Sequence, residues 1–303
     1  MKTLDARASA ALLPYSALVD ALRVAAVGAS RGEINCPLRQ VIPMAGGGAL
    51  LSMIALGSDL AAHKLVTFVP SNPARHLPTI QGQVSAWDAR TGAHLLTLDG
   101  ATVTGRRTAA LSLLGVKTLL GFSPKCFRIF GTGTQARHHV EAIAQLYPGA
   151  RIGVTGRTPA AAEEFCIVHR ALSAGLAPMS RIGDEQIDVV ISCTTSPEPV
   201  YEEPARRGRL IIAVGSFTPT AAEIGAGTVR ASQVYVDDLD GARQEAGDLI
   251  RAGVDWHHVH PLSQLLQGGD LPDGPVLFKT VGHAAWDLAA ARVAVAGLGA
   301  ATA

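Results

Sequence analysis

A glycine-rich turn between a strand-like and a helix-like segment constrains the fold of this chain most strongly. The turn, Gly131-Thr132-Gly133-Thr134-Gln135-Ala136, directly follows the apolar run at residues 127–130 and opens an amphipathic run at residues 136–147. In such a turn the first glycine permits the tight bend, the second lets the backbone approach a pyrophosphate, and the alanine keeps the helix close to the strand. The alternative is an ordinary glycine turn, because 32 glycines produce such spacings by chance. The order strand, turn, helix favours a dinucleotide-binding domain.

Two different patterns divide the chain. Up to about residue 100, short β-rich runs alternate with turns, which predicts a mainly antiparallel sheet with strands at 66–69, 83–87 and 95–98. From residue 121 on, strand-like runs alternate with helix-like ones, which predicts a parallel sheet with right-handed crossovers and strands at 127–130, 151–155, 187–193, 210–214 and 234–236. Residues 104–120 and 284–296 have helical patterns. If the last helix closes back on the first part, the parallel sheet belongs to an inserted domain.

Composition argues against several classes of function. Apolar residues make up 48% of the chain, charged residues 17%, and the net charge is +1, so nothing favours a nucleic-acid or membrane surface. The four cysteines are scattered and form no Cys-x-x-Cys pair, which predicts reduced, buried thiols in a soluble, cytoplasmic protein. Ten histidines make no ligand cluster, so no metal is expected. No Gly-x-Ser-x-Gly frame supports a hydrolase.

The end of the second predicted strand of the parallel sheet bears on the choice of coenzyme. An NAD-selective site usually has an acid there to bind the ribose hydroxyls. This chain instead has Val154-Thr155-Gly156-Arg157-Thr158, in which Arg157 and Thr158 could bind a 2′-phosphate. The alternative for Arg157 is a solvated surface arginine. We therefore expect NADPH, with NADH also possible.

Three basic residues lie in apolar or glycine-rich surroundings in the first part of the chain. They are Arg39, Lys64 and Arg107. Arginine forks bind carboxylates at two points, and a lysine in a dry pocket has a readily shifted pKa and can move a proton. The alternative is that each belongs to a structural ion pair. We interpret His283 and Asp287 as a helix-surface pair, with a role near the coenzyme as the alternative. Acids at 237–238 and 245–248 are interpreted as solvated loop and helix-cap residues.

A set of short segments in a fixed order runs through almost the whole chain. The segments are Arg39 with Gly46-Gly47-Gly48, Lys64-Leu65-Val66, residues 72–82, Asp88-Ala89-Arg90-Thr91-Gly92, Arg107-Thr108-Ala109-Ala110, residues 131–136, Asp188-Val189-Val190-Ile191, Ala213-Val214-Gly215 and residues 278–287. Together they resemble the ornithine cyclodeaminase/mu-crystallin family, whose members carry such segments in this order.

This resemblance implies a homodimer of an α/β fold. In each chain a Rossmann dinucleotide-binding domain, residues 119–281, is inserted into an α+β substrate-binding and dimerisation domain, residues 1–118 plus 282–303. It also implies that Arg39, Lys64 and Arg107 bind the substrate carboxylate and handle a proton. The cofactor contacts that we expect are Thr108, Gly131, Gly133, Thr134, Gln135, Ala136, Arg157, Thr158, Thr194, Val214, Gly215 and Lys279.

Two departures from the family pattern favour one reaction over the others. Cyclodeaminase members carry an acid just after the Ala-Val-Gly stretch, where this chain has Phe217, and a glutamate where it has Leu51. A diamino acid needs such acids, whereas a ring with one carboxylate does not. We therefore expect reduction of cyclic imino acids, 1-pyrroline-2-carboxylate to L-proline or 1-piperideine-2-carboxylate to L-pipecolate. Ornithine cyclodeaminase, an alanine dehydrogenase-like enzyme and a crystallin-like NADPH-binding protein are the alternatives.

Overall fold

The computed structural model describes residues 2–182 and 187–300 of this chain. The chain divides into two compact units, residues 1–110 with 283–303 and residues 111–282. The first division lies inside helix α3 (Gly100–Leu119), eight residues before the boundary that we drew from the sequence. Pattern alone could not place it, because the helix continues unbroken from one unit into the other.

The first unit is built on a six-stranded sheet whose pairings are antiparallel, except that the first strand runs parallel to its neighbour. This agrees with the antiparallel sheet predicted for the first part of the chain. In sheet order the strands are β1 (Lys2–Thr3), β6 (His94–Asp99), β5 (Ile80–Asp88), β4 (Leu60–Phe68), β3 (Gly48–Leu56) and β2 (Gln40–Met44).

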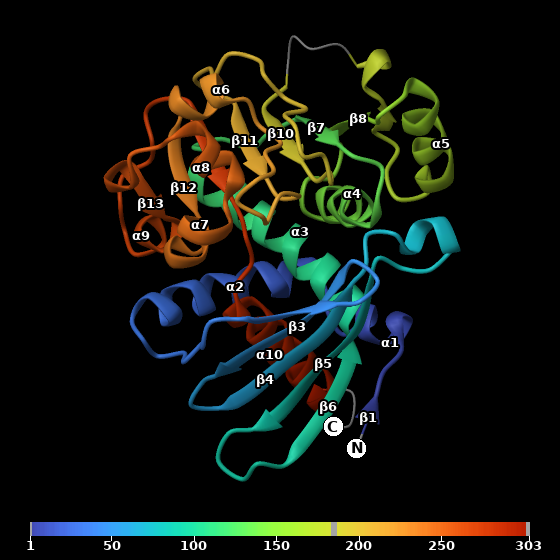
Figure 1. The fold of residues 1–303 in the computed structure, drawn as a ribbon, viewed down its shortest axis with the longest axis vertical. Helices are drawn as coiled ribbons and strands as arrows, with labels where there is room; N and C mark the ends of the chain where they lie inside the picture. Colours follow the sequence, from blue (N-terminus) through green and yellow to red (C-terminus); the bar gives the residue numbers. More distant parts are fainter. Residues whose placement is uncertain (1, 183–186, 301–303) are drawn as a thin grey trace. The chain divides into compact units, whose positions relative to one another are not determined.

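The first unit also contains α1 (Ala6–Ala11), α2 (Tyr15–Ser30), α10 (Ala284–Ala300) and the first part of α3, residues 100–110. Helix α2 begins directly after Pro14, which cannot donate a backbone hydrogen bond and suits a helix start. Helix α10 packs against α2 and against strands β3, β4 and β5, and Figure 1 shows it alongside the sheet. The C-terminal helix therefore returns to the unit in which the chain began.

The second unit contains an eight-stranded sheet in which every described pairing is parallel. In sheet order the strands are β13 (Val259–Pro261), β12 (Gln233–Val236), β14 (Val276–Lys279), β11 (Leu210–Ala213), β10 (Val189–Ser192), β7 (Cys126–Phe130), β8 (Arg151–Thr155) and β9 (Leu176–Pro178). The helices are α4 (Thr134–Leu146), α5 (Pro159–His169), α6 (Ala226–Arg230), α7 (Leu239–Glu245), α8 (Gly247–Ala252) and α9 (Leu262–Leu266). Short 3₁₀ turns occur at Asn72–Arg75 in the first unit and at Met179–Arg181 and Trp256–His258 in the second.

The strand order of this second sheet contains a reversal. From β7 the chain builds outward through β8 to β9, and it then returns to the other side of β7 to form β10 and β11. In open α/β sheets, ligands bind at the carboxyl ends of the strands where the order reverses. The carboxyl ends of β7 and β10 are therefore the expected ligand-binding edge.

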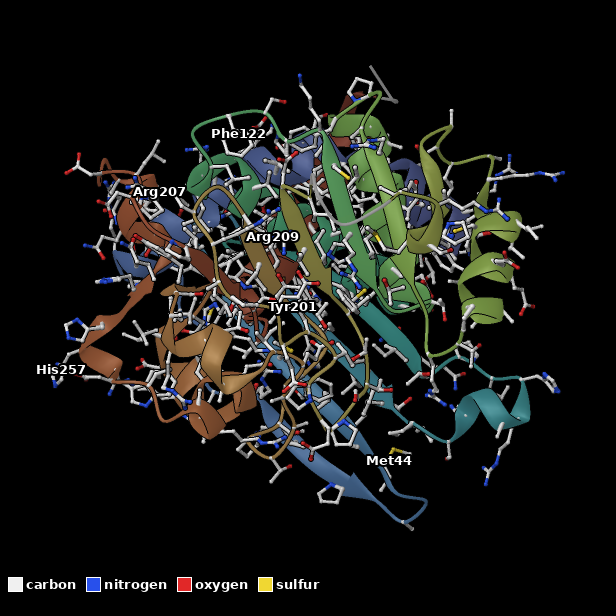
Figure 2. All side chains as sticks on the ribbon, turned by 90° about the horizontal axis from the view of Figure 1, so that it is seen from above. Met44, Phe122, Tyr201, Arg207, Arg209 and His257 are labelled. Carbon is white, nitrogen blue, oxygen red and sulfur yellow. The ribbon has the colours of Figure 1, made fainter. Side chains whose placement is uncertain are left out.

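A polar cluster anchors the beginning of β11. Arg209 lies next to Tyr201 (Figure 2) and donates hydrogen bonds of 2.8 Å to its hydroxyl and 2.6 Å to Glu203. A buried guanidinium with its charge and donors satisfied holds a strand end firmly. No helix of the described residues is both long enough and apolar enough to cross a membrane.

Candidate active site

The glycine turn after β7 has the geometry that the sequence predicts for a phosphate-binding loop. Gly131 has φ of +118°, and a Cβ there would lie 2.8 Å from the Cys193 carbonyl oxygen, so no larger residue fits. Gly133 is the N-cap of α4, and a Cβ there would meet no atom within 4 Å. The start of this 13-residue helix is therefore exposed, and an open helix N-terminus can bind a pyrophosphate.

The loops after β10 and β11 meet this turn at the same edge of the sheet. Cys193 donates its N–H to the Phe130 carbonyl at 3.0 Å, and a Cβ on Gly215 would overlap the Thr194 carbonyl oxygen. Close backbone approach therefore requires glycine at both 131 and 215. Together with the loop after β8, these segments are called the strand-end loops, residues 131–135, 156–158, 193–194 and 214–215. In these loops Gly131 lies against Cys193, and Gly215 lies against Thr194. The cofactor roles of Thr194, Val214 and Gly215 stay predictions.

The loop after β8 carries the two residues predicted to recognise a 2′-phosphate. Arg157 is exposed and free to reach a ligand from solvent. Thr158 is the N-cap of α5 and accepts the Ala161 N–H at 3.2 Å, so its hydroxyl also has a structural task. A Cβ on Gly156 would lie 3.2 Å from the Thr132 side chain, which shows how closely this loop approaches the glycine turn.

Lys279 does not join the strand-end loops, against the prediction. Its side chain is fully buried, its Nζ lies 2.8 Å from Asp248, and it donates a hydrogen bond to the Ser216 carbonyl. Asp248 is equally buried, so its interpretation as a solvated acid is wrong. Asp238, in contrast, caps α7 as expected. Thr108 belongs to the first unit, and its cofactor role stays a prediction.

In the first unit, a buried carboxylate joins two of the predicted basic residues. Lys64 on β4 lies 2.8 Å from Asp287 on α10, and Arg107 on α3 lies 3.4 Å from the other oxygen of the same carboxylate. The interpretation of His283 and Asp287 as a helix-surface pair is wrong: α10 begins only after His283, and Asp287 is 1% exposed. The sequence signal for Asp287 was its place among alanines, on a helix without a polar face.

The chain positions Lys64 by strand alternation. Along β4 the buried side chains are Leu60, Ala62, Lys64 and Val66, so the lysine occupies an apolar position on the covered face of the sheet. Burial lowers the pKa of Lys64 from 10.5 to about 8, and repulsion from Arg107 and Arg39 acts in the same direction, while Asp287 opposes it. Near neutral pH this ammonium can therefore give up and regain a proton.

Arg39 precedes β2 and is half-buried, close enough for its charge to act on Lys64. The three predicted basic residues thus belong to one place, which we call the basic cluster: Arg39, Lys64 and Arg107, with Asp287. Lys64 and Arg107 share one carboxylate, which leaves a positive charge unbalanced. Arg107 Nε is buried without an aligned hydrogen bond among the described residues. A ligand carboxylate would balance the extra positive charge and would accept the hydrogen bond that Arg107 Nε can donate.

Comparison with known proteins identifies the family. The model of the ornithine cyclodeaminase/mu-crystallin family matches residues 7–296. The chain belongs to this family. The resemblance read from the sequence is therefore confirmed, and with it the combination of a parallel nucleotide-binding sheet and a second domain.

The relatives of this chain within the family include reductases. It is 53% identical over 293 residues to Delta(1)-pyrroline-2-carboxylate reductase 2 of Burkholderia ambifaria, which covers 96% of this chain and 94% of that protein. A Delta(1)-pyrroline-2-carboxylate/Delta(1)-piperideine-2-carboxylate reductase of Azospirillum brasilense matches with the same identity and coverage. The solved structure of the Thermococcus litoralis Delta(1)-pyrroline-2-carboxylate reductase, in complex with NADH and L-proline, aligns with a TM-score of 0.88 at 27% identity, over 100% of this chain and 98% of that one.

Proposed function

We propose that this protein reduces cyclic imino acids, 1-pyrroline-2-carboxylate and 1-piperideine-2-carboxylate, with a nicotinamide coenzyme. The observation that carries the proposal is the basic cluster, in which Lys64 and Arg107 share the single carboxylate of Asp287. Arg39 and Arg107 bind the substrate carboxylate, and Lys64 holds or delivers the proton of the imine nitrogen. The reductases that share 53% identity with the chain support the same reaction class.

The coenzyme, when bound, supplies the hydride, and the protein supplies position and charge. The strand-end loops fit a dinucleotide because Gly131 permits close approach and Gly133 leaves the start of α4 open. The relative from Thermococcus litoralis, with NADH bound, supports a nicotinamide coenzyme.

The residues at the family's two acid positions favour a plain ring over a diamino acid. Leu51 pairs with Val66, which lies on the same face of the sheet as Lys64, so an apolar side chain occupies the place of the family's glutamate. Phe217 takes the other acid position, after β11. An ammonium group on the substrate would lose its hydration without a carboxylate to replace it, which costs several kcal/mol, on the order of the buried-ion penalty.

The test is a pair of assays on the purified protein. With 1-pyrroline-2-carboxylate or 1-piperideine-2-carboxylate we expect rapid loss of NADPH absorbance. With L-ornithine and NAD⁺ we expect no release of ammonia. Ammonia release at enzymatic rates without imine-dependent NADPH oxidation would instead make the protein a cyclodeaminase. The ratio of kcat/KM for the two imines measures its ring-size preference.

We propose NADPH as the preferred coenzyme, because an exposed arginine and no acid follow β8. Arg157→Ala is expected to raise KM for NADPH by about 10- to 100-fold, the loss of one charge-assisted hydrogen bond of about 1.5–3 kcal/mol, and to leave KM for NADH nearly unchanged. Arg170→Ala, an exposed arginine after α5, is the matched control. Equal kinetics with the two coenzymes in the parent protein would contradict this assignment.

We propose that the protein is a homodimer. Its interface is the face of the first unit's sheet that lies opposite the face carrying Lys64. Large apolar side chains on that face remain exposed in the single chain: Ile54 is 47% exposed, Leu56 45% and Ile42 53%. Met44 at the end of β2 is exposed as well, and Figure 2 shows it at the periphery. A self-complementary face of this kind is what a two-fold dimer covers.

Sedimentation of the parent protein is therefore expected to give about twice the chain mass of 31.4 kDa. Ile54→Asp, which places a charge in the proposed interface, is expected to give the 31.4 kDa monomer. Val24→Asp, at a 65% exposed position on α2, should remain a dimer. A parent protein that sediments as a monomer at micromolar concentration would refute the proposal.

The cytoplasmic location stays a prediction. Its support is chemical: Cys126, Cys166 and Cys193 are buried thiols that form no disulfide.

A further inference from the structure

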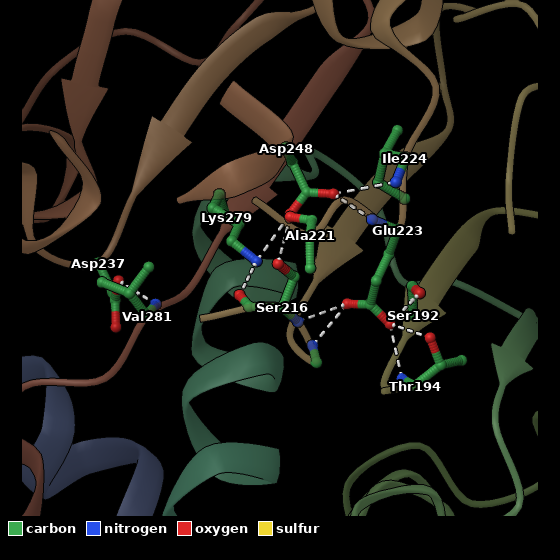
Figure 3. Close-up of polar contacts among 11 residues, drawn as sticks. Ser192, Thr194, Ser216, Ala221, Glu223, Ile224, Asp237, Asp248, Lys279 and Val281 are labelled. Atoms are coloured by element: carbon green, nitrogen blue, oxygen red, sulfur yellow. Dashed lines mark hydrogen bonds and ion pairs between the residues drawn. The ribbon is translucent and has the colours of Figure 1, made fainter. Parts of the chain in front are cut away.

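A buried carboxylate ties together the ends of β10 and β11. Glu223, which is 0% exposed, lies between them and accepts five hydrogen bonds (Figure 3). One oxygen accepts from the Ser192 hydroxyl at 2.6 Å and from the Thr194 N–H and hydroxyl at 2.6 and 2.8 Å. The other oxygen accepts the N–H groups of Gly215 at 2.6 Å and Ser216 at 3.1 Å. Glu223 is not among the residues that were singled out from the sequence.

A second buried carboxylate holds Glu223 in turn. Asp248 at the start of α8 accepts the backbone N–H groups of Glu223 and Ile224 at 2.6 and 2.9 Å. Its other oxygen lies 2.8 Å from Lys279, which also donates to the Ser216 carbonyl. Lys279 therefore stabilises the loop that carries Glu223, and Figure 3 shows the chain of contacts from Lys279 through Asp248 to Glu223. This network explains why the lysine is not available to a ligand.

The hydrogen bonds to Glu223 decide which backbone atoms of the strand-end loops are left for a ligand. In a trans peptide the N–H and the C=O point in opposite directions. Because the N–H groups of Gly215 and Ser216 point at Glu223, the carbonyl oxygens of the same two peptide units, those of Val214 and Gly215, point away from it. The loop after β11 thus presents hydrogen-bond acceptors opposite the carboxylate, a surface suited to a donor such as a primary amide.

We propose that Glu223 is a positioning residue of the coenzyme site, which orients the Val214 and Gly215 carbonyls to accept the carboxamide N–H groups of the nicotinamide. The inference rests on the proposed function in so far as the ligand is a nicotinamide dinucleotide. Glu223 itself touches no part of that ligand. Its role requires a carboxylate, since three backbone N–H groups, which can only donate, and two hydroxyls all point at its two oxygens.

Glutamine at this position separates orientation from mere packing. Glu223→Gln keeps the shape of the side chain but turns an amide N–H₂ towards the Thr194 N–H at one end or towards the Gly215 and Ser216 N–H groups at the other, and it leaves a neutral oxygen at the opposite end. In either case the hydrogen bonds that orient Gly215 and Ser216 are weakened or lost. We expect the Val214 and Gly215 carbonyls to lose their orientation, while the glycine turn at residues 131–135, which binds the pyrophosphate, keeps its own geometry. The variant should therefore be selectively poor at binding the nicotinamide end.

The experiment compares two ligands by calorimetry in the absence of any imino acid. They are the coenzyme that the parent protein binds more tightly, NADPH or NADH, and the same molecule without nicotinamide, 2′-phospho-ADP-ribose or ADP-ribose. In Glu223→Gln we expect Kd for the coenzyme to rise about 10-fold, equivalent to about 1.4 kcal/mol, and Kd for the fragment to stay within about 2-fold. Glu202→Gln, at an exposed glutamate, should change neither value.

Two results would overturn the inference. One is an equal loss of affinity for the coenzyme and for the fragment in Glu223→Gln, which would mean that Glu223 has a general structural role. The other needs no variant: if the parent protein binds the 3-acetylpyridine analogue, which lacks the amide N–H groups, as tightly as the natural coenzyme, its site does not recognise the carboxamide. This second measurement also decides the matter if Glu223→Gln does not fold. A parent protein that binds no nicotinamide dinucleotide at all would instead contradict the proposed function.

Discussion

Lys64→Ala is expected to lower kcat for cyclic imine reduction by about 10²- to 10⁴-fold, the usual contribution of a positioned proton donor. Lys64 is the one buried ammonium that the described part of the first unit places beside Arg107 and Asp287. In the proposed function Lys64 is the proton source of the imine nitrogen, so the variant lacks the group that delivers this proton. Initial rates with saturating NADPH measure the effect.

The Lys64→Ala variant should bind NADPH as the parent does, because the strand-end loops belong to the other unit of the chain. Lys117→Ala, which removes an exposed lysine from α3, is the control and should leave kcat unchanged. If kcat of Lys64→Ala falls less than about 3-fold, no proton transfer by Lys64 limits the reaction.

Asp287→Asn is expected to shift the pH dependence of imine reduction to lower pH. The pKa of Lys64 is about 8, and the attraction of Asp287 is what raises it against burial and the two arginines. In the proposed function the protonated ammonium is the active form, so kcat/KM of the parent is expected to fall as the pH rises through about 8. Removal of the carboxylate charge lowers this pKa further, so the fall in kcat/KM begins at lower pH. Because the imine substrate also titrates, the pH profiles of variant and parent are measured with the same substrate, so that its titration affects both profiles equally.

The same substitution is expected to destabilise the protein. It leaves two buried cations without a counter-charge, and removal of one partner of a buried ion pair typically costs about 3–5 kcal/mol. Thermal unfolding should show a clearly lower Tm. Asp59→Asn is the control. Asp59 pairs with Arg292, which lies on the same helix as Asp287, but the Asp59 side chain is half exposed. Loss of this ion pair should therefore lower the free energy of unfolding by less than about 1 kcal/mol. An unshifted pH profile in Asp287→Asn would show that Asp287 does not act on Lys64.

Local chemistry made part of this molecule predictable. Gly131 and Gly133 lie between a strand and a helix, which is the order that a phosphate-binding turn requires, and the close backbone approach at Gly131 leaves no room for a larger residue. The alternation along β4 puts Lys64 on the covered face, because successive side chains of a strand point to opposite sides. Such features depend on residues that are close together in the chain, so they can be inferred from the sequence. The α/β class and the basic residues of the first unit were predictable for that reason.

The partners of buried charges were not predictable in this way. From the sequence, Asp287 was interpreted as a helix-surface acid, because the spacing of nearby residues contains no information about β4. That strand supplies Lys64 and lies more than two hundred residues earlier in the chain. Lys279 reads as a cofactor ligand until Asp248 and Ser216 are seen to enclose it. Glu223 had no signal at all, since its five donors come from two strand ends that only the parallel sheet brings together. The sequence by itself determined the turns, the alternation and the kinds of charge; tertiary structure alone decided which charges meet, because the energy of a buried ion depends on groups that are distant along the chain and adjacent only in the fold.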